Sequence, residues 1–393
     1  MVYYIISIFF WLSIAALVHS YLFYPWLMAW LASKKKQVFK SSVEFIPEIA
    51  VLLAAYNEEK VIRQKIESVL SADYPAQKLT LYLGSDASTD RTDEIAGQMA
   101  KTNSNLFFIR FNERTGKAGI INQLAIRAKK SGAEIFIMTD ANVMFVQNTI
   151  SELVLGFEDK RIGQVAANIL STGKQYKGIA FQEEQYIQRE NLIKYHEGKA
   201  WGTMMGAFGA CYAVRSDLMP KIPLNFMMED FFISMHVLKT GYKAVSNPKA
   251  LAEEDVSFKM KEEFIRKKRI SAGNYQNLVF YKELLWPCWN KISFSYWSHK
   301  VLRWFGPFLL IIILGLGIAL AFQSTFYFFL LLLQITIWLI PLLELLLQML
   351  GIHLVISRFI YYFYTMNLAL LAGFFKYLKG IKTNVWEPTE RNR

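Results

Sequence analysis

Two long stretches of this chain carry no charged side chain, and they constrain its architecture more than any other feature. Residues 1–33 contain no Asp, Glu, Lys or Arg, and neither do residues 304–343. A helix that crosses a bilayer needs about 20 consecutive, mostly apolar residues, so the first stretch has room for one span and the second for two. A third apolar segment, roughly residues 353–375, contains Arg358 and Asn367. The chain is therefore predicted to be a multi-pass membrane protein.

A cleaved secretory signal is the alternative interpretation of residues 1–33. That segment has no basic start, its apolar part is too long, and no Ala-x-Ala site precedes Lys34. We therefore expect an N-terminal transmembrane helix over residues 1–33 and a C-terminal transmembrane region of two to three spans over residues 305–376. Residues 284–304 mix aromatic side chains with cations, which predicts an amphipathic segment in the membrane interface.

The formal net charge of +12 does not indicate a nucleic-acid partner, because two of its clusters lie beside the apolar segments. These are Lys34–Lys36 and the C-terminal cations Lys376, Lys379 and Lys382. Positive charge beside a span marks the cytoplasmic side and attracts membrane lipid. We therefore expect a protein of the plasma (inner) membrane with a cytoplasmic soluble domain and a cytoplasmic basic tail, residues 377–393.

One question of topology stays open in the sequence. Three complete spans after the soluble domain would place the basic tail outside, against the charge rule. Either the third segment does not cross fully, or a helix within residues 286–304 adds a crossing. We favour the cytoplasmic tail.

The soluble domain, residues 34–283, alternates apolar strand-like runs with helical patterns. Strands are predicted over residues 48–56, 79–86, 105–111 and 135–141, and a helix from Glu58 to Leu70. This alternation is typical of an α/β domain whose sheet is mostly parallel and has helices on both faces. Such sheets bind ligands at the carboxyl ends of their strands.

Polar side chains follow three of these predicted strands, namely Asn57, Asp86 and Asp140. A turn is the plain interpretation of Asp140 and Asn142, because both residue types favour strand ends. A metal site is the alternative, because Mg²⁺ and Mn²⁺ bind oxygen ligands. Three strands that bring polar residues to one edge favour a ligand site.

Common nucleotide and metal signatures are absent from the sequence. No Gly-x-Gly-x-x-Gly follows the first strand. Gly116-Lys117 could end a phosphate-binding P-loop, but such a loop would begin with glycine at position 111, where this chain has Phe111. The two cysteines and five histidines show no zinc spacing. These observations disfavour a dinucleotide-binding fold, ATP hydrolysis and a zinc site.

Six segments carry a family resemblance. They occur in this order: PEIAVLLAAYNEE (47–59), GSDASTDRTDEIA (84–96), RTGKAGIINQLA (114–125), TDANVMF (139–145), GAFGACYAVR (206–215) and MMEDFFISMHVLKTGYKA (227–244). The chain thereby resembles family 2 glycosyltransferases over about residues 47–275. It is most similar to the membrane-embedded branch that contains cellulose, chitin, hyaluronan and poly-N-acetylglucosamine synthases.

This resemblance implies a GT-A-like fold and a UDP-sugar donor. It implies that Asp140-Ala141-Asn142 holds Mg²⁺ or Mn²⁺ on the donor diphosphate, although Asn142 replaces the usual second aspartate. The implied donor-binding residues are Tyr56, Asn57, Glu58, Asp86, Lys117, Asp140 and Arg269. Helix capping is the alternative for the polar cluster after Asp86, with Asp90 as the expected cap. A solvated loop lysine is the alternative for Lys117.

Glu229-Asp230 matches the Glu-Asp element of the family, which implies that Asp230 is the catalytic base with Glu229 beside it. An acceptor hydroxyl is a poor nucleophile until a carboxylate takes its proton, and in-line attack then inverts the sugar configuration. Two acids at a helix N-terminus, where negative charge is favourable, are the alternative. Apolar residues flank both acids, which favours the catalytic role.

The next element departs from the family pattern. Polymerising members carry Gln-x-x-Arg-Trp, whereas this chain has Arg266-Lys267-Lys268-Arg269-Ile270. Arg269 is retained and suits bidentate contact with phosphate. The missing tryptophan removes the aromatic platform for the acceptor sugar, so processive polymerisation is in question. A basic face against anionic lipid is the alternative role of residues 266–268.

The sequence as a whole predicts an inverting, metal-dependent glycosyltransferase at the cytoplasmic membrane face, acting in cell-surface polysaccharide synthesis. Its acceptor is expected to be a polysaccharide or a lipid-linked saccharide, and single-sugar addition is the alternative to polymerisation. A non-catalytic transporter or scaffold is the alternative from another class, and it predicts loss of the metal and base positions. A nucleotidyltransferase shares the fold type but has no need of membrane spans.

Overall fold

A computed structural model describes residues 1–36, 39, 45–171, 179–254, 260–352 and 354–385. The chain forms two compact units, which are described separately. The sheet unit contains Met28–Gln175, Glu184–Ser257 and Gly380–Arg393. The helical unit contains Met1–Leu27, Tyr176–Glu183 and Phe258–Lys379. Residues 260–283, which we expected in the soluble domain, thus group with the apolar helices, and residues 380–385 group with the sheet.

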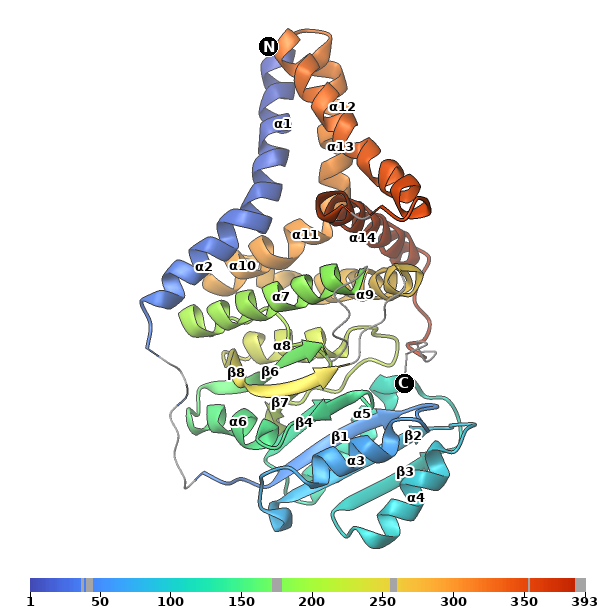
Figure 1. The fold of residues 1–393 in the computed structure, drawn as a ribbon. Coiled ribbons are helices and arrows are strands. Elements are labelled where there is room, and N and C mark those ends of the chain that lie inside the picture. The colour runs from blue at the N-terminus through green and yellow to red at the C-terminus, as the bar shows by residue number, and fades with distance from the viewer. Residues whose placement is uncertain (37–38, 40–44, 172–178, 255–259, 353, 386–393) are drawn as a thin grey trace. The chain divides into compact units, whose positions relative to one another are not determined.

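The sheet unit is built on an eight-stranded sheet in the described part of the chain, with the order β3-β2-β1-β4-β7-β6-β8-β5 (Figure 1). Its strands are β1 Ile49–Ala55, β2 Leu79–Asp86, β3 Leu106–Phe111, β4 Ile135–Thr139, β5 Val143–Phe145, β6 Ile162–Ser171, β7 Cys211–Arg215 and β8 Lys243–Glu254. Strands β3, β2, β1 and β4 are parallel, which confirms the predicted α/β arrangement. The other half is mixed, because β7 is antiparallel to both β4 and β6, and β5 is antiparallel to β8.

Helices cover both faces of the parallel half, as predicted. The sheet-unit helices are α3 Ile62–Leu70, α4 Thr92–Thr102, α5 Gly116–Lys130, α6 Thr149–Leu155, α7 Ile179–Trp201, whose first residues belong to the helical unit, and α8 Glu229–Lys239. Short 3₁₀ turns lie at Ala76–Lys78, Gly156–Glu158 and Ser216–Leu218. All seven residues of β1 are buried, as expected for a strand covered on two sides.

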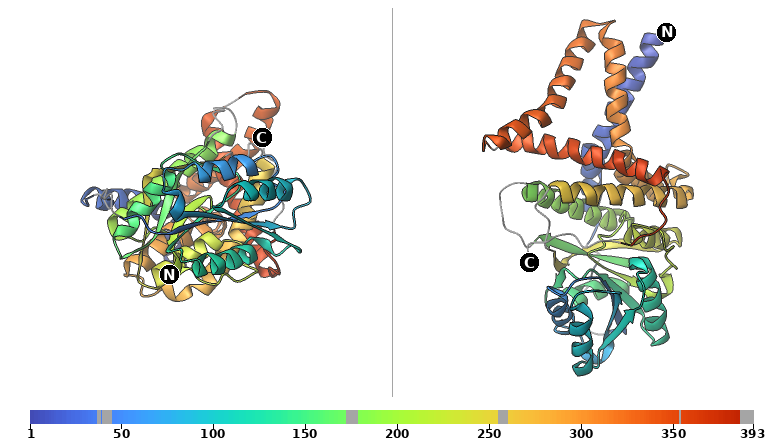
Figure 2. Two further views of the ribbon diagram at one scale, coloured as in Figure 1. Left: turned by 90° about the horizontal axis from the view of Figure 1, so that it is seen from below. Right: turned by 90° about the vertical axis from the view of Figure 1, so that its right-hand side faces the viewer.

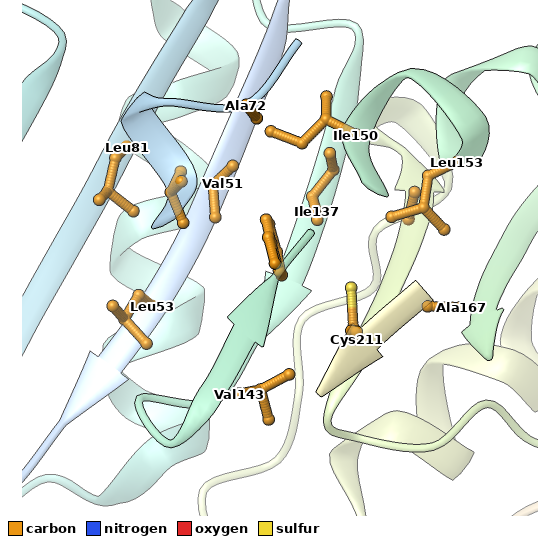
Figure 3. Packing of buried hydrophobic residues seen from close by; sticks show 14 of the residues in the cluster. Val51, Leu53, Ala72, Leu81, Ile137, Val143, Ile150, Leu153, Ala167 and Cys211 are labelled. Atoms are coloured by element: carbon orange, nitrogen blue, oxygen red, sulfur yellow. The ribbon is translucent and has the colours of Figure 1, made fainter. Parts of the chain in front are cut away.

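The two faces of the sheet pack against different helices. On one face, Val51, Leu53 and Leu81 join a cluster with residues of α3, α4 and α6, part of which Figure 3 shows. On the other face, Gly84 of β2 lies against α5, where a methyl group at its Cα would fall 2.4 Å from Ile120 Cγ2. A glycine at this position therefore allows α5 to pack closely on the sheet.

Helix α3 begins at Ile62, four residues later than the predicted start at Glu58. Asn57 has a φ of +53°, which is a left-handed conformation. The N–H of Glu58 then donates to Thr92, the first residue of α4, and the N–H of Glu59 donates to Asp90 in the loop after β2, rather than starting a helix. The polar contacts at the strand ends thus override the local helical pattern.

The helical unit contains the apolar segments. Its elements are α1 Val2–Val18, a π-helical turn His19–Phe23, α2 Tyr24–Ser33, whose last residues belong to the sheet unit, α9 Met260–Phe280, a 3₁₀ turn Lys282–Leu285, α10 Lys291–Ser295, a π-helical turn Tyr296–Val301, α11 Leu302–Trp304, α12 Gly306–Ala321, α13 Thr325–Met349 and α14 Val355–Leu378. Helix α1 packs on α12, and α12 packs on α13. Phe10, Ile313 and Tyr327 form part of their shared apolar contact.

Three helices in the described residues are long and apolar enough to cross a membrane: Val2–Ser33, Thr325–Met349 and Val355–Leu378. The pair Lys291–Trp304 and Gly306–Ala321, bent by 65°, counts as a fourth if it forms one span. Within this unit α14 has its most extensive contact with α9 and runs alongside it (Figures 1 and 2). Gly373 makes this approach possible, because a methyl group there would fall 2.6 Å from Lys268 O.

The only acid within α12 or α13 is paired. Glu344 of α13 is fully buried, and Arg358 Nε lies 3.4 Å from its Oε1. Gln348 Nε2 donates to the same oxygen at 3.1 Å, and Ser357 donates to the other. A carboxylate among apolar helices needs such partners, because burying a lone charge is costly. The cluster holds α13 and α14 together.

Candidate functional site

Six of the predicted site residues lie at or just after the carboxyl ends of β1, β2 and β4: Tyr56, Asn57, Glu58, Asp86, Asp140 and Asn142. The loops after β1 and β2 are joined by side-chain bonds: the Asn57 N–H donates to Ser88 Oγ at 3.2 Å, and Asn57 Oδ1 accepts the Thr89 N–H at 2.9 Å. The Glu58 N–H donates to Thr92 Oγ1 at 2.8 Å. Asn57 therefore has a structural task as well as its predicted ligand role.

Asp90, the predicted cap of α4, lies one residue before the N-cap position, which Arg91 occupies, but its carboxylate still binds the first residue of the helix. Its Oδ1 accepts the N–H of Thr92 at 2.9 Å. Its Oδ2 accepts the N–H of Glu59, on the loop after β1, at 3.0 Å. One carboxylate thus satisfies an unpaired helix donor and fixes the neighbouring loop.

Asp86 is fully buried at the end of β2, and its carboxylate accepts hydrogen bonds from the residues at the start of α5. The Thr115 N–H donates to Oδ1 at 2.6 Å, the Gly116 N–H donates to Oδ2 at 3.1 Å, and Arg114 Nε donates to Oδ2 at 3.0 Å. Negative charge at a helix N-terminus is favourable. Asp86 therefore fixes the first residues of α5, and with them the position of Lys117.

Arg114 also connects Asp86 to Tyr56. The Arg114 Cζ atom lies 3.3 Å from the centroid of the Tyr56 ring, in a cation–π arrangement. The Tyr56 ring, the Arg114 guanidinium and the Asp86 carboxylate, from three segments distant in sequence, therefore meet at one end of the sheet.

Lys117 lies at the centre of the acidic residues. Its Nζ is 2.7 Å from Asp140 Oδ1 and 2.5 Å from Glu229 Oε1. Burial by itself lowers the pKa of Lys117, but the charges of Asp140 and Glu229 outweigh burial and raise this pKa above its ordinary value. The lysine is consequently a permanent cation that joins the β4 end to the start of α8.

Glu229 and Asp230 are the first two residues of α8, and both are buried. Asp230 Oδ1 accepts the N–H of Phe231 at 2.7 Å. Gly209 leaves room for the carboxylate, since a methyl group there would lie 3.0 Å from Asp230 Oδ2. Burial and the neighbouring charge of Glu229 raise the pKa of Asp230 to about 6. A carboxyl group with this pKa can take up a proton near neutral pH.

Asp140 and Asn142 differ in what their side chains contact. Asp140 bonds Lys117 through Oδ1, and 34% of its side chain remains exposed. Asn142 is only 5% exposed, and its Nδ2 donates to Glu254 Oε1 at 3.4 Å. Among the described residues no three His, Cys, Asp or Glu side chains form a group that could hold a metal. The partly exposed carboxylate of Asp140 is a suitable ligand for a hard divalent cation whose other ligands would be oxygen atoms of the sugar donor.

Arg269 lies on α9 in the helical unit and is exposed, and its contact with the donor stays a prediction. Two of its basic neighbours are engaged within that unit. Arg266 Nε lies 2.8 Å from Glu263 Oε2, and Lys267 Nζ lies 3.4 Å from Glu263 Oε1 and 3.6 Å from Glu183 Oε1. Because buried carboxylates pair with Arg266 and Lys267, a lipid-facing role for these two residues is not supported.

Sequence reasoning missed three side chains of this site: Lys65, Arg114 and Glu254. Arg114 begins the RTGKAG segment, three residues before Lys117. This short spacing was the signal that could have placed Arg114 in the same site as Lys117. Glu254 ends β8, and the antiparallel register that pairs Val143 with it brings it to Asn142. Nothing in the sequence indicated that register.

Comparisons with known proteins agree with this arrangement. The model of glycosyl transferase family 2 matches residues 50–218, and that of glycosyl transferase family group 2 matches residues 135–376, more than half of the chain. A probable glycosyltransferase, YdaM of Bacillus subtilis, is 23% identical over 255 residues, which cover 60% of this chain and 57% of YdaM. The poly-β-1,6-N-acetyl-D-glucosamine synthase of Staphylococcus aureus is 26% identical over 53% of this chain and 50% of the synthase.

A third relative is the β-monoglucosyldiacylglycerol synthase of a Nostoc species, which is 28% identical over 30% of this chain and 25% of its own length. The chain thus spans less than two thirds of each of these relatives. Among solved structures, a mannosyltransferase from Pyrobaculum calidifontis, in complex with GDP-Man and Mn²⁺, has a TM-score of 0.69 and 21% identity over 94% of this chain and 99% of that one. This likeness shows the GT-A-like fold. The matched family models, together with that fold, establish that the chain belongs to glycosyltransferase family 2.

Proposed function

We propose that this protein is an inverting, metal-dependent glycosyltransferase that transfers a sugar from a UDP-sugar to a polysaccharide or lipid-linked saccharide. The observation that carries the proposal is the convergence of Lys117, Asp140, Glu229 and Asp230 at one end of the sheet. This group contains a cation for phosphate, an exposed carboxylate for a metal and a buried carboxyl group suited to proton transfer. If Asp140 only formed a turn and the two acids only stabilised a helix N-terminus, these three groups would have no reason to lie together.

The donor nucleoside is proposed to bind where Tyr56, Asn57, Glu58 and Asp86 meet. Asp86 and Arg114 offer a charged, hydrogen-bonding edge, and Tyr56 offers an aromatic surface. The diphosphate is proposed to lie near Lys117 and Asp140, with Arg269 as a further contact. Cationic side chains stabilise the charge that gathers on the departing nucleoside diphosphate.

Asp230 is proposed to act as the base. Its carboxylate takes the proton of the acceptor hydroxyl while the hydroxyl oxygen attacks the anomeric carbon, and the bond from that carbon to the diphosphate breaks. Attack from the side opposite the leaving group inverts the configuration. Glu229 is proposed to hold Lys117 in position and, through its own charge, to keep the pKa of Asp230 high.

A bound Mg²⁺ or Mn²⁺ would supply positive charge next to the leaving diphosphate. Asp140 is proposed as its direct protein ligand, and Asn142 as the second candidate through its amide oxygen. The Mn²⁺ in the Pyrobaculum mannosyltransferase complex supports a divalent cation without deciding between the two metals.

Membrane association is proposed from the long apolar helices of the helical unit. The positive charges beside them favour a multi-pass protein of the plasma (inner) membrane with the sheet unit and the tail in the cytoplasm. The names of two relatives, a poly-N-acetylglucosamine synthase and a glucosyldiacylglycerol synthase, support an acceptor that is a saccharide or a lipid. The first of these names also supports the proposed role in cell-surface polysaccharide synthesis.

Single-sugar addition to a lipid-linked acceptor is the second candidate. The sequence favours it at one position, because Ile270 stands where polymerising members have the tryptophan that stacks on the acceptor. Without that stacking a growing chain would be held less firmly after each transfer.

The test is release of nucleoside diphosphate by the purified full-length protein in lipid nanodiscs. UDP-sugars, GDP-mannose and dTDP-sugars are supplied with Mg²⁺, Mn²⁺ or EDTA, with and without a membrane lipid extract, and the products are sized. We expect release with one UDP-sugar, its loss in EDTA and its loss in Asp230→Asn. Release with GDP-mannose alone would overturn the UDP assignment, and no release with any donor would favour a non-catalytic scaffold. Long products would exclude single addition.

A further inference from the structure

A lysine lies completely buried beneath the candidate site. Lys65 of α3 has no exposed surface, and its helix neighbours Ile62, Ile66 and Val69 belong to the apolar core. No carboxylate lies within ion-pair distance of its ammonium group in the parts of the chain that the structure describes. Burying a charge without an acidic partner is costly, so hydrogen bonds must hold it there.

The Lys65 ammonium group contacts both ends of the turn that carries Asp140 and Asn142. Its Nζ donates to Thr139 Oγ1 at 2.9 Å, just before the turn. It also donates to the backbone carbonyl of Val143, just after the turn. The third side of the ammonium group faces the Phe145 ring, whose centroid lies 3.8 Å away.

The same turn is tied to the neighbouring strand through Thr139. Thr139 Oγ1 accepts from Lys65 and donates to the carbonyl of Ala210 at 3.0 Å. Across the turn, the Val143 N–H donates to Asp140 O at 3.2 Å. Lys65 therefore closes a buried hydrogen-bonded ring around residues 139–143, while 34% of the Asp140 side chain remains exposed.

We propose that Lys65 is a positioning residue that fixes the Asp140–Asn142 turn from below and thereby sets the affinity for the donor diphosphate and its metal. This inference rests on the proposed function. A cation that contacts the residues on both sides of the three-residue turn Asp140–Asn142 limits how far Asp140 can move. Reacting groups are sensitive to such movement, since a shift of about 1 Å can reduce a rate by about a hundredfold.

Electrostatics agree with this role. Burial lowers the pKa of Lys65 to about 7, while the charge of Asp140 acts in the opposite direction. The thiol of Cys211 contributes no charge near neutral pH, because burial raises its pKa to about 12. Asp140 therefore helps to keep Lys65 charged. A lysine kept only for packing would gain nothing from lying under a carboxylate, because methionine fills a similar volume with no charge to bury.

The experiment compares Lys65→Met, Thr139→Val, the double variant and Ile66→Val in the full-length protein. Ile66→Val is the matched control, because Ile66 is fully buried on the same helix and belongs to its apolar core contacts. Affinities for UDP, GDP and Mn²⁺ are measured by calorimetry. KM and kcat are measured for donor and acceptor, and the melting temperature of each variant is recorded.

We expect Lys65→Met to weaken nucleotide binding in the presence of Mn²⁺ and to lower kcat/KM for the donor, each by about tenfold or more. The KM for the acceptor should stay unchanged. Thr139→Val should act in the same direction, and the double variant should be little worse than Lys65→Met, because both changes break one ring. Ile66→Val should bind and react like the wild type even if it melts earlier.

Two results separate the failure of this inference from the failure of the proposed function. If the wild type binds nucleotide and Lys65→Met binds and reacts equally well, Lys65 only packs the core and the inference is wrong. If the wild type binds no nucleotide, the proposed function is wrong and this inference falls with it. Equal losses of nucleotide affinity and kcat/KM in Lys65→Met and Ile66→Val would also overturn the inference, since they would reflect a general loosening of the apolar core around α3.

Discussion

The ammonium group of Lys117 lies 2.7 Å from the carboxylate of Asp140, although the two residues come from different elements of the sheet unit. Lys117 belongs to the first turn of α5, whereas Asp140 follows β4. The Asp86 carboxylate, at the end of β2, accepts hydrogen bonds from the backbone N–H groups of Thr115 and Gly116 and so fixes the start of α5. The ion pair therefore depends on the ends of the parallel strands β2 and β4. The ion pair between Lys117 and Asp140 would make the proposed phosphate and metal functions of the site mutually dependent.

Replacing Lys117 with Met should abolish most activity. The change removes the cation nearest to the proposed diphosphate and leaves Asp140 and Glu229 to repel each other. We expect kcat/KM for the donor to fall by about a hundredfold or more, as for other losses of preorganised charge. Donor titrations of sugar transfer measure this.

Lys129→Met is the matched control for Lys117. Lys129 lies near the other end of α5 and pairs with Asp217 at 2.9 Å, with 54% of its side chain exposed. Exposed pairs contribute about 0–1 kcal/mol, so this variant should keep its activity and melting temperature. A similar loss of activity in both variants would contradict a specific role for Lys117.

Asp230→Asn should separate activity from stability. An amide cannot take the proton of the acceptor hydroxyl, so kcat should fall by about 10²–10⁴. Burial and Glu229 disfavour the charged form of Asp230, so a neutral amide should leave the melting temperature unchanged or higher. An active variant would remove Asp230 from the mechanism. An inactive variant that also melts much earlier would leave misfolding as the cause.

The rate of transfer should rise as the pH increases through about 6. The pKa of Asp230 is raised to about 6 by burial and by Glu229, against the opposing effects of Lys117, the Phe231 N–H and Lys194. Asp230 acts as a base only when it is deprotonated, so below this pKa of the free protein kcat/KM should fall by about tenfold per pH unit. Lys194→Met removes one opposing cation and should move the midpoint upward. A flat profile from pH 5 to 7 would contradict Asp230 as the base.

Gly116→Ala should destabilise the sheet unit more than Gly132→Ala, although both glycines have left-handed φ values, of +75° and +88°. The backbone strain is therefore similar and costs about 1 kcal/mol. At Gly132 no atom lies within 4 Å of the added methyl group, whereas at Gly116 Asn384 Oδ1 would lie 2.0 Å away. We expect about 1–3 kcal/mol of additional destabilisation at Gly116 from this overlap.

Thermal unfolding of the two glycine variants measures that difference. Asn384→Ala in the Gly116→Ala background should restore part of the loss, because it removes the overlapping amide. Equal melting temperatures for Gly116→Ala and Gly132→Ala would mean that the segment near Asn384 does not pack on the start of α5 in solution.

Much of the sheet unit was predictable because its signals are local. The parallel strands β1, β2, β3 and β4 lie within about two residues of their predicted bounds, since each is a short apolar run that ends in polar residues. Asn57, Asp86 and Asp140 follow such runs. Their placement at one end of the sheet follows from the parallel direction of the strands.

The mixed half of the sheet was not predictable in the same way. Strand β7 lies between β4 and β6, and β8 lies between β6 and β5. Hydrophobic pattern identifies a buried strand but does not say which strand lies beside it or in which direction it runs. The contact between Asn142 and Glu254, 112 residues apart, depends on that pairing.

By itself, the sequence determined which segments are apolar enough to cross a membrane, where the first strands end and which residue types gather there. These properties depend on neighbours along the chain, such as runs of apolar residues and polar residues at turns. The tertiary structure alone decided that Lys117 joins Asp140 to Glu229, that Arg114 lies over Tyr56 and that Lys65 is buried under the Asp140 turn. Each of these contacts joins side chains from elements distant in sequence, so only strand pairing and helix packing bring the charges close enough to interact.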